Sequence, residues 1–172
     1  ADDNKLLSAI ADAGCTQLLI GFESLCSENL QNLNQNHWKM KKLESYKEII
    51  NRIQSFGIGV VGSFVVGMEN DAADVFDNLY EFIEEISLYA TNITVLTPFP
   101  GTETYEKLKH EKRLFSNDWS AYNGFELTFK PNKMTIEEFE KGFMDLNKRL
   151  NSTERMNRVI NHFKTVFTNK NS

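Results

Sequence analysis

The fold is decided by residues 58–71, Ile-Gly-Val-Val-Gly-Ser-Phe-Val-Val-Gly-Met-Glu-Asn-Asp, an apolar run that contains glycines and ends in acidic residues. Such a run is typical of a buried strand that opens into a loop and a helix start. Glycine weakens a strand interior, so Gly62 and Gly67 indicate close approach of another backbone or of a flat ligand. A core strand with two packing glycines is the alternative interpretation.

Two further strands are expected on either side of this one. Residues 16–22 form an apolar run, and residues 92–97 form another that ends at Pro98. A helical pattern follows each of the three runs. Strand-then-helix units of this kind predict parallel strands joined by right-handed helical crossovers, so the fold class is α/β. The spacing fits a TIM-like barrel, but three units make only a partial (β/α) half-barrel. Either the sheet is open or more strands lie upstream.

The connection between the first two strands divides into two parts. Residues 34–42 are rich in Asn and Lys and are expected to be an exposed connector. A helix with a clear 3-4 apolar repeat is expected from Leu43 to Phe56. After the second strand, Asp71 and Asp74 suit the positive N-terminus of the next helix.

The chain is expected to divide near residue 115. Residues 1–115 hold the three β/α units, and residues 116–172 form a C-terminal extension with a short strand at 125–129 and a two-helix hairpin. Thr135 to Glu138 is a capping box at the start of the first of these helices. Trp119 and its aromatic neighbours are expected to be core residues.

Composition narrows the class of protein. With 172 residues, 41% of them hydrophobic, the chain is long enough for one ordinary core. No stretch of 18 apolar residues and no apolar leader is found, so we expect a cytoplasmic protein without a membrane span. Cys15 and Cys26 are the only cysteines, too few and too far apart for a disulfide scaffold or a cysteine-rich metal site. The histidines are scattered, so a self-contained metal site is not expected.

Two polar side chains, Glu23 and Ser24, come directly after the first strand. Ligands of α/β proteins bind at the carboxyl ends of parallel strands, which makes this pair a candidate site. The pair could instead only begin the next turn.

Taken in order, the motifs resemble the second half of a radical S-adenosylmethionine enzyme. The similarity covers nearly all of residues 5–150 and is greatest to the branch whose members carry an N-terminal cobalamin-binding domain. It is carried by Ala13-Gly14-Cys15, Ile20-Gly21-Phe22-Glu23-Ser24, Gly57-Ile58-Gly59-Val60, Gly62-Ser63-Phe64-Val65-Val66-Gly67-Met68 and Leu96-Thr97-Pro98-Phe99-Pro100-Gly101-Thr102.

The resemblance implies a site for S-adenosylmethionine. The three strands correspond to the fourth, fifth and sixth of the family's partial barrel. Glu23 and Ser24 would contact the ribose, since a carboxylate accepts hydrogen bonds from a vicinal diol. The adenine would lie against the fifth strand and the exit of the sixth. The residues assigned to this wall are Gly62, Phe64, Val66, Gly67, Thr97 and Pro98.

One departure from the family pattern limits what this chain can do. The Cys-x₃-Cys-x₂-Cys loop that holds the family's [4Fe–4S] cluster is absent, and Cys15 and Cys26 cannot replace it. The cluster ligands, and possible cobalamin binding, are therefore expected upstream, with the other half of the barrel as the main partner. No catalytic or metal-binding residue is assigned here, and the segment alone is expected to be inactive. The loop after the second strand is shorter than in relatives, so the role of Glu69 stays open.

Two other functions remain open. A different barrel enzyme, such as a lyase or an aldolase, would use Glu23 as an acid or base and needs a Lys or His at another strand end. An interaction module would use the basic C-terminal region and the aromatic residues at 119–129. For the chain by itself, we also expect self-association through the exposed strand at 16–22. The substrate cannot be named from the sequence.

Overall fold

A computed structural model describes residues 3–33 and 45–169. The predicted connector at 34–42 and Leu43 lie outside these ranges. The elements, in chain order, are α1 (Asn4–Asp12), β1 (Gln17–Glu23), α2 (Ser27–Leu33), α4 (Tyr46–Ser55), β2 (Gly59–Val66), α5 (Val75–Glu85), β3 (Ala90–Val95), α6 (Glu103–His110), the 3-10 helix η2 (Trp119–Ala121), α7 (Ile136–Leu150) and α8 (Thr153–Asn169).

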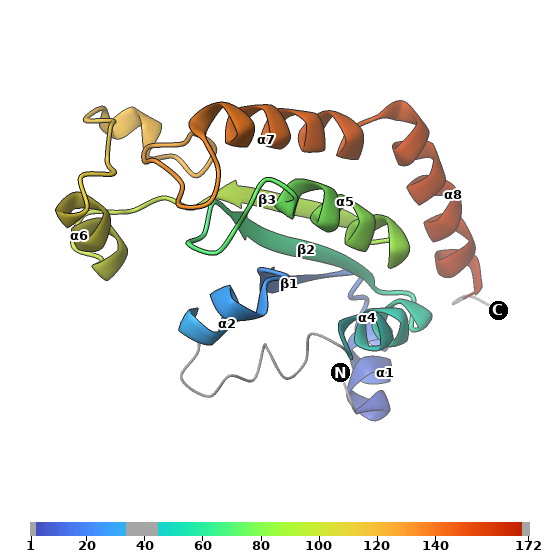
Figure 1. Ribbon diagram of the computed structural model, residues 1–172. Coiled ribbons are helices and arrows are strands. Elements are labelled where there is room, and N and C mark those ends of the chain that lie inside the picture. The colour runs from blue at the N-terminus through green and yellow to red at the C-terminus, as the bar shows by residue number, and fades with distance from the viewer. Residues whose placement is uncertain (1–2, 34–44, 170–172) are drawn as a thin grey trace.

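The three strands form one parallel sheet in the order β1-β2-β3. Gly59 of β2 is paired with Gln17 of β1, and Val61 is paired with Ala90 of β3, so the three strands finish at the same edge. Helices connect the strands, as Figure 1 shows. The predicted α/β class and the partial half-barrel of parallel strands with helical crossovers are confirmed.

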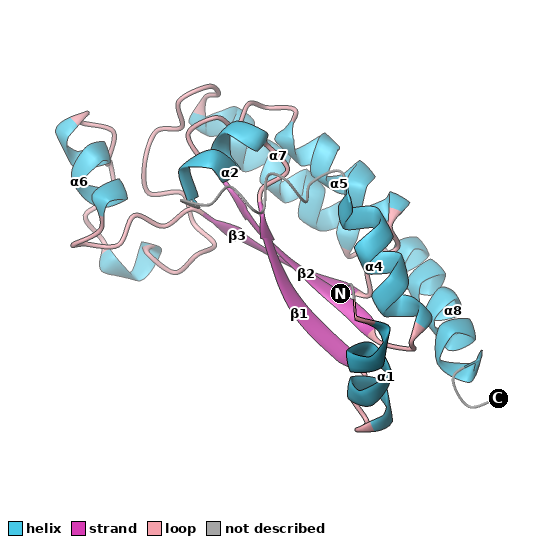
Figure 2. Ribbon diagram, turned by 90° about the horizontal axis from the view of Figure 1, so that it is seen from below, coloured by secondary structure: helices cyan, strands magenta, loops and turns pink. Residues whose placement is uncertain are grey.

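Helices cover one face of the sheet. Figures 1 and 2 show α4 and α5 on this face, with α7 stacked outside α5. Apolar residues at helical spacing drive this packing, since α5 buries Phe76, Leu79 and Ile83. The strands contribute their alternate residues to the same core, among them Phe64 and Val66 of β2. Among residues 3–33 and 45–169, no helix lies on the opposite face of the sheet in these views.

The helix boundaries follow from local chemistry. Asp3 caps α1, because its Oδ1 accepts hydrogen bonds from the backbone N–H groups of Lys5 and Leu6. Gly57 follows α4 with a φ of 72°, a left-handed conformation that suits glycine. The predicted capping box of α7 is present, with Thr135 and Glu138 satisfying each other's backbone N–H groups.

The C-terminal segment packs onto the body of the molecule. α7 lies so close to α5 that a Cβ at Gly142 would be 2.2 Å from the ring of Phe76. α8 turns away from α7 at a corner (Figure 1) and packs by Phe163 on Tyr89, with ring centroids 4.9 Å apart. Arg155 of α8 joins this contact by donating to Glu84 of α5.

The segment between α6 and α7 is largely irregular. In place of the expected short strand at 125–129, a single antiparallel bridge joins Leu114 to Phe129. Of the aromatic residues expected to be buried, Phe129 and Tyr122 are, whereas Trp119 and Phe125 are 60% and 61% exposed. None of the helices in the described ranges is long and apolar enough to cross a membrane.

Candidate functional site

The end of β1 has an unusual backbone. The pairing with β2 shifts between Gly21 and Glu23, and Glu23 has a φ of 68°, a left-handed conformation that costs a non-glycine residue of the order of 1 kcal/mol. Ser24 is 5% exposed, and its Oγ accepts hydrogen bonds from the backbone N–H of Cys26 and from Asn29 Nδ2. Ser24 therefore also begins the turn into α2, so the two interpretations of this pair are compatible.

The loop after β2, residues 67–71, is fixed by a buried carboxylate. Asp71 Oδ2 accepts hydrogen bonds of 2.9 Å from the backbone N–H groups of both Gly67 and Met68, and Asn29 Nδ2 donates to Oδ1 at 2.7 Å. Burial raises the pKa of Asp71 above its ordinary value, although these donors oppose the shift. The expectation that Asp71 supports the N-terminus of α5 is thus corrected: its carboxylate folds back onto the loop.

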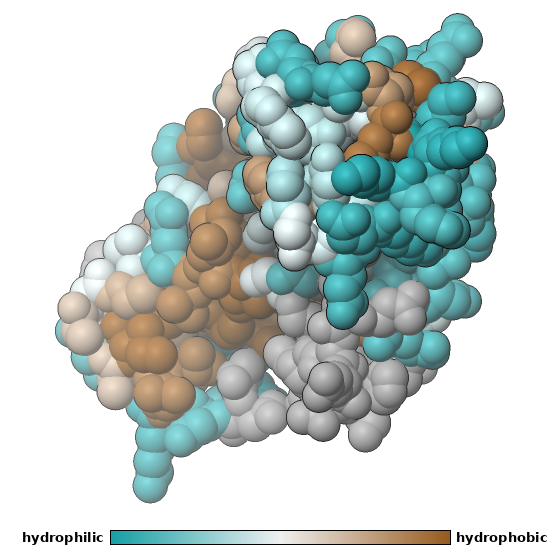
Figure 3. Space-filling view, turned by 90° about the vertical axis from the view of Figure 1, so that its left-hand side faces the viewer, coloured by the Kyte–Doolittle hydropathy of each residue, from teal (hydrophilic) through white to brown (hydrophobic). Residues whose placement is uncertain are grey.

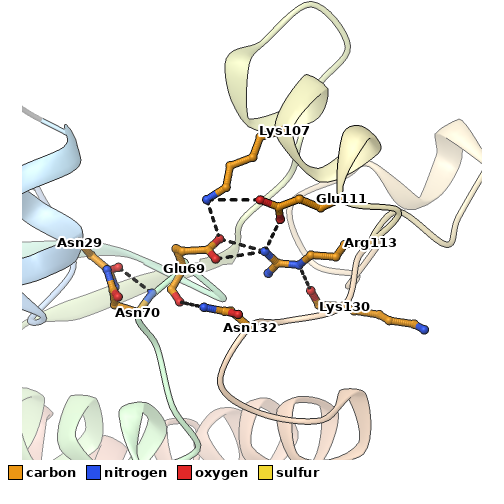
Figure 4. Close-up of polar contacts among 8 residues, drawn as sticks. All are labelled: Asn29, Glu69, Asn70, Lys107, Glu111, Arg113, Lys130 and Asn132. Carbon is orange, nitrogen blue, oxygen red and sulfur yellow. Dashed lines mark hydrogen bonds and ion pairs between the residues drawn. The ribbon is translucent and has the colours of Figure 1, made fainter.

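The same loop is tied to α6 by a group of ion pairs, which Figure 4 shows in detail. Arg113 Nη1 lies 3.1 Å from both carboxylate oxygens of Glu69 and 2.9 Å from Glu111 Oε2. Its Nε donates to the carbonyl oxygen of Lys130 at 2.8 Å, and Lys107 Nζ lies 3.3 Å from Glu69 Oε2. We call these residues (Glu69, Lys107, Glu111 and Arg113) the Glu69 cluster.

The Glu69 cluster changes the acidity of its central carboxylate. Partial burial raises the pKa of Glu69, but the hydrogen bonds and charges of Arg113 and Lys107 outweigh it, so the pKa lies below its ordinary value. Glu69 is therefore held as an anion that anchors the loop. This answers the question about Glu69 that its shortened loop left open in the sequence.

Two cavities lie on either side of loop 67–71. The first, of about 490 Å³, opens between the end of β1 and the start of α5. Its lining includes Glu23, Ser24, Phe64 and Val66 from the predicted site, together with Cys26, Val65, Asn70, Asp71, Asp74, Asn78 and Lys133. The second, of about 590 Å³, is lined by Gly67 and by Met68, Glu69, Leu96, Thr104 and Lys107.

The structure brings the predicted residues together only in part. Gly62 is packed inside the core, where a Cβ would be 2.7 Å from Leu88 and 2.8 Å from the ring of Phe64. Thr97 Oγ1 donates to the carbonyl oxygen of Val95, and Pro98 is buried beside it at the exit of β3. None of these three lines either cavity, whereas four of the predicted residues share the first.

Three residues that the sequence did not single out take part in the site. Asn29 joins α2 to the loop by accepting from Asn70 N–H and donating to Asp71. Lys133 enters the first cavity from the segment before α7, where it pairs with Ala72 through a backbone bridge. Arg113 holds Glu69. Each acts on residues far away in the chain, so local patterns give no signal for it.

The cysteines do not form a metal site. Cys15 lies before β1, and its Sγ donates to the carbonyl oxygen of Gln17; Cys26 lies after β1, and its Sγ donates to Glu28. Across residues 3–33 and 45–169, no three His, Cys, Asp or Glu side chains are placed to hold a metal ion. The two cysteines of the sequence are too few to supply the three thiolates of the family's cluster loop.

Comparison with known proteins finds enzymes as relatives. The chain is 30% identical over 138 residues, 80% of its length, to bacteriochlorophyllide d C-12(1)-methyltransferase of Chlorobaculum tepidum, of which it covers 29%. It is 25% identical over 98% of its length to an anaerobic magnesium-protoporphyrin IX monomethyl ester cyclase of Rubrivivax gelatinosus, of which it covers 26%. It is also 25% identical over 66% of its length to hopanoid C-2 methylase of Rhodopseudomonas palustris, of which it covers 21%.

The chain thus spans less than a third of the length of each of these relatives. No family model matches it. The parallel β/α sheet of this chain agrees with the partial barrel that the resemblance implies. The chain belongs to the radical S-adenosylmethionine superfamily, among members of the cobalamin-associated type.

Proposed function

We propose that this chain is part of a longer radical S-adenosylmethionine enzyme and forms the ribose and adenine side of its cofactor site. The observation that carries the proposal is the first cavity, at the carboxyl ends of β1 and β2, where Glu23 and Ser24 lie beside the apolar Phe64 and Val66. A nucleoside needs this combination of a hydrogen-bonding rim for its diol and an apolar wall for its base.

The roles of the residues follow from their chemistry. Glu23 would accept hydrogen bonds from the ribose hydroxyls, and loop 67–71, held by Asp71 and the Glu69 cluster, would keep the wall of the site in place and exclude water. S-adenosylmethionine, reduced by a [4Fe–4S] cluster whose ligands lie outside this chain, would supply a 5′-deoxyadenosyl radical. The segment itself would bind and orient the nucleoside, while cobalamin, where present, would lie in another domain.

The relatives suggest the kind of reaction. Two of them are named as methyltransferases of bacteriochlorophyllide d, one as a cyclase of a magnesium porphyrin and one as a methylase of a hopanoid. These names share large, mostly apolar ring systems. We infer that the full-length enzyme modifies such a ring, with methyl transfer favoured by the names of the more similar relatives.

The proposal is tested in the full-length protein. Glu23→Ala should weaken the binding of S-adenosylmethionine, measured by calorimetry, about 10-fold, the effect of one or two lost charge-assisted hydrogen bonds. Glu28→Ala is the matched control, since Glu28 is an exposed acid on α2. If both variants bind S-adenosylmethionine with the same affinity, Glu23 does not contact the cofactor. If the full-length protein lacks the Cys-x₃-Cys-x₂-Cys loop, the proposed function is wrong.

A second candidate rests on Lys133. This lysine lines the same cavity as Glu23. A lyase or aldolase with a Schiff-base intermediate needs such a pair of a lysine and an acid or base. Lys133 lies in the loop that precedes α7 and not at a strand end. Borohydride reduction in the presence of dihydroxyacetone phosphate, followed by mass spectrometry, would detect a covalent adduct on Lys133. A radical S-adenosylmethionine enzyme would form no such adduct on Lys133.

A further inference from the structure

The face of the sheet opposite the helices carries exposed apolar side chains. Leu19 in the middle of β1 is 68% exposed, and Val61 and Val65 of β2 are only half-buried. Figure 3, viewed from the end at which the strands finish, shows a broad hydrophobic area on this side of the molecule. Parallel sheets are normally buried on both faces, so this one is suited to contact something other than water.

The register of the strands arranges the residues of this face in rows. Leu19, Val61 and Ala90 are paired across the sheet and form an apolar row. One step nearer the carboxyl end, Gly21 is paired with Ser63, which is paired with Asn92. Neighbouring strands are about 4.8 Å apart, so Ser63 and Asn92 stand side by side.

The second row differs from the first in chemistry and in size. Gly21 has no side chain and leaves room, while Ser63 and Asn92 each offer both a donor and an acceptor. Within the described part of the chain, neither of these two side chains makes a hydrogen bond. Asn92 is exposed and Ser63 is half-buried, so both side chains are able to hydrogen-bond a group that comes to lie on this face.

The face also lacks charge. The positions that the pairing and the burial pattern place on it are Gln17, Leu19, Gly21, Val61, Ser63, Val65, Ala90, Asn92 and Thr94. None of them is a cation, so a carboxylate or phosphate placed here would lose its water without compensation. The row therefore favours a neutral hydrogen-bonding group, such as a carbonyl or a hydroxyl.

We propose that Ser63 and Asn92 are substrate-binding residues that hydrogen-bond an uncharged oxygen of an apolar ring, while Leu19 and Val61 contact the ring itself. This inference rests on the proposed function, because it assigns the substrate of the same enzyme to the open face beside the nucleoside site. The residues of the proposed substrate site, Leu19, Val61, Ser63 and Asn92, line neither of the two cavities at loop 67–71.

The test uses the full-length protein with bacteriochlorophyllide d as the probe, titrated by its absorption. Asn92→Ala should raise the Kd for the probe at least 10-fold and Ser63→Ala about 5-fold, with the Kd for S-adenosylmethionine unchanged within 2-fold. Gln17→Ala is the control, because Gln17 is exposed on the same face but outside the polar row. It should leave both affinities unchanged.

The outcomes separate the two proposals. Wild-type protein that does not bind S-adenosylmethionine would overturn the proposed function. Wild-type protein that binds S-adenosylmethionine but not bacteriochlorophyllide d would overturn the assigned substrate class. If Ser63 and Asn92 instead contact the rest of the barrel, both alanine variants will lower the melting temperature and leave the Kd for the probe at the wild-type value, which also overturns the inference.

Discussion

Removal of the Arg113 guanidinium should release the loop that separates the two cavities. The side chain of Arg113 is only 14% exposed, and it contacts Glu69, Glu111 and the carbonyl of Lys130 at 2.8 to 3.1 Å. In Arg113→Met the apolar stem stays while all of these hydrogen bonds are lost. The experiment therefore measures the polar contacts and not a cavity.

The size of the effect can be worked out from these contacts. A hydrogen bond to a charged group contributes about 1.5 to 3 kcal/mol. Adding this contribution for all four hydrogen bonds of Arg113 overestimates the loss of free energy. Glu69 and Glu111 are each 35% exposed, so water can replace part of the hydrogen bonding that they lose. Lys107 also stays in place beside Glu69. We expect a net loss of about 2 kcal/mol, which corresponds to roughly a 30-fold change in an opening equilibrium.

Hydrogen exchange read by mass spectrometry is the suitable assay, since it reports local opening free energies. Protection of the amides in residues 67–71 and 107–113 should fall about 30-fold in Arg113→Met. Arg158→Met is the matched control, because Arg158 also contacts two carboxylates, those of Glu84 and Glu154, but is 50% exposed. Exposed pairs contribute less than about 1 kcal/mol.

The pH dependence gives an independent check. The pKa of Glu69 is lower in the folded state than its ordinary value, so its stabilising contribution is complete above the ordinary pKa of a glutamic acid, about 4.3. That contribution is lost as the pH falls below 4.3 through the folded-state pKa. Asp71, whose raised pKa acts in the opposite direction, is present in both proteins, so the difference in loop protection between the wild type and Arg113→Met should become smaller as the pH falls below 4.3. Equal losses in the two arginine variants, or parallel pH profiles, would refute the role given to the Glu69 cluster.

Three further changes have defined outcomes. Gly142→Ala should lower stability by about 1 to 3 kcal/mol in urea unfolding, because its Cβ would meet the ring of Phe76, whereas Lys141→Ala on the exposed side should not. Asp71→Asn should cost about 1 to 3 kcal/mol, since the amide oxygen can replace Oδ2 for the two backbone N–H groups, but its NH2 group then faces Asn29 Nδ2, which loses its acceptor; unchanged urea midpoints would contradict this. Residues 1–172 alone should self-associate through β1, and Leu19→Lys should shift light scattering toward the monomer; a wild type that is already monomeric at high concentration would contradict the expectation.

Local chemistry explains why so much of the fold was predictable. The three strands and the helices between them each have their own apolar period and their own end signals, such as Gly57 after α4 and the capping box at Thr135. The pair Glu23–Ser24 could be found because a position just after a strand is visible in the sequence. Asn29 and Arg113 could not, because their partners Asp71 and Glu69 are 42 and 44 residues away.

It is harder to predict from the sequence which face of the sheet a strand residue occupies. This choice of face decides which residues can contact a ligand. β2 reads Gly-Val-Val-Gly-Ser-Phe-Val-Val, a nearly continuous apolar run in which alternation cannot distinguish the two faces. Only the tertiary structure fixes the choice: Phe64 stacks on Phe22 under the helices, which turns Ser63 and Val65 to the open side. Phe64 and Val66 both line the first cavity from the helix side. Their assignment to the adenine wall stays a prediction. Nothing in the sequence distinguishes Ser63, yet the same alternation places it beside Asn92 on the face that the helices of the described residues leave uncovered.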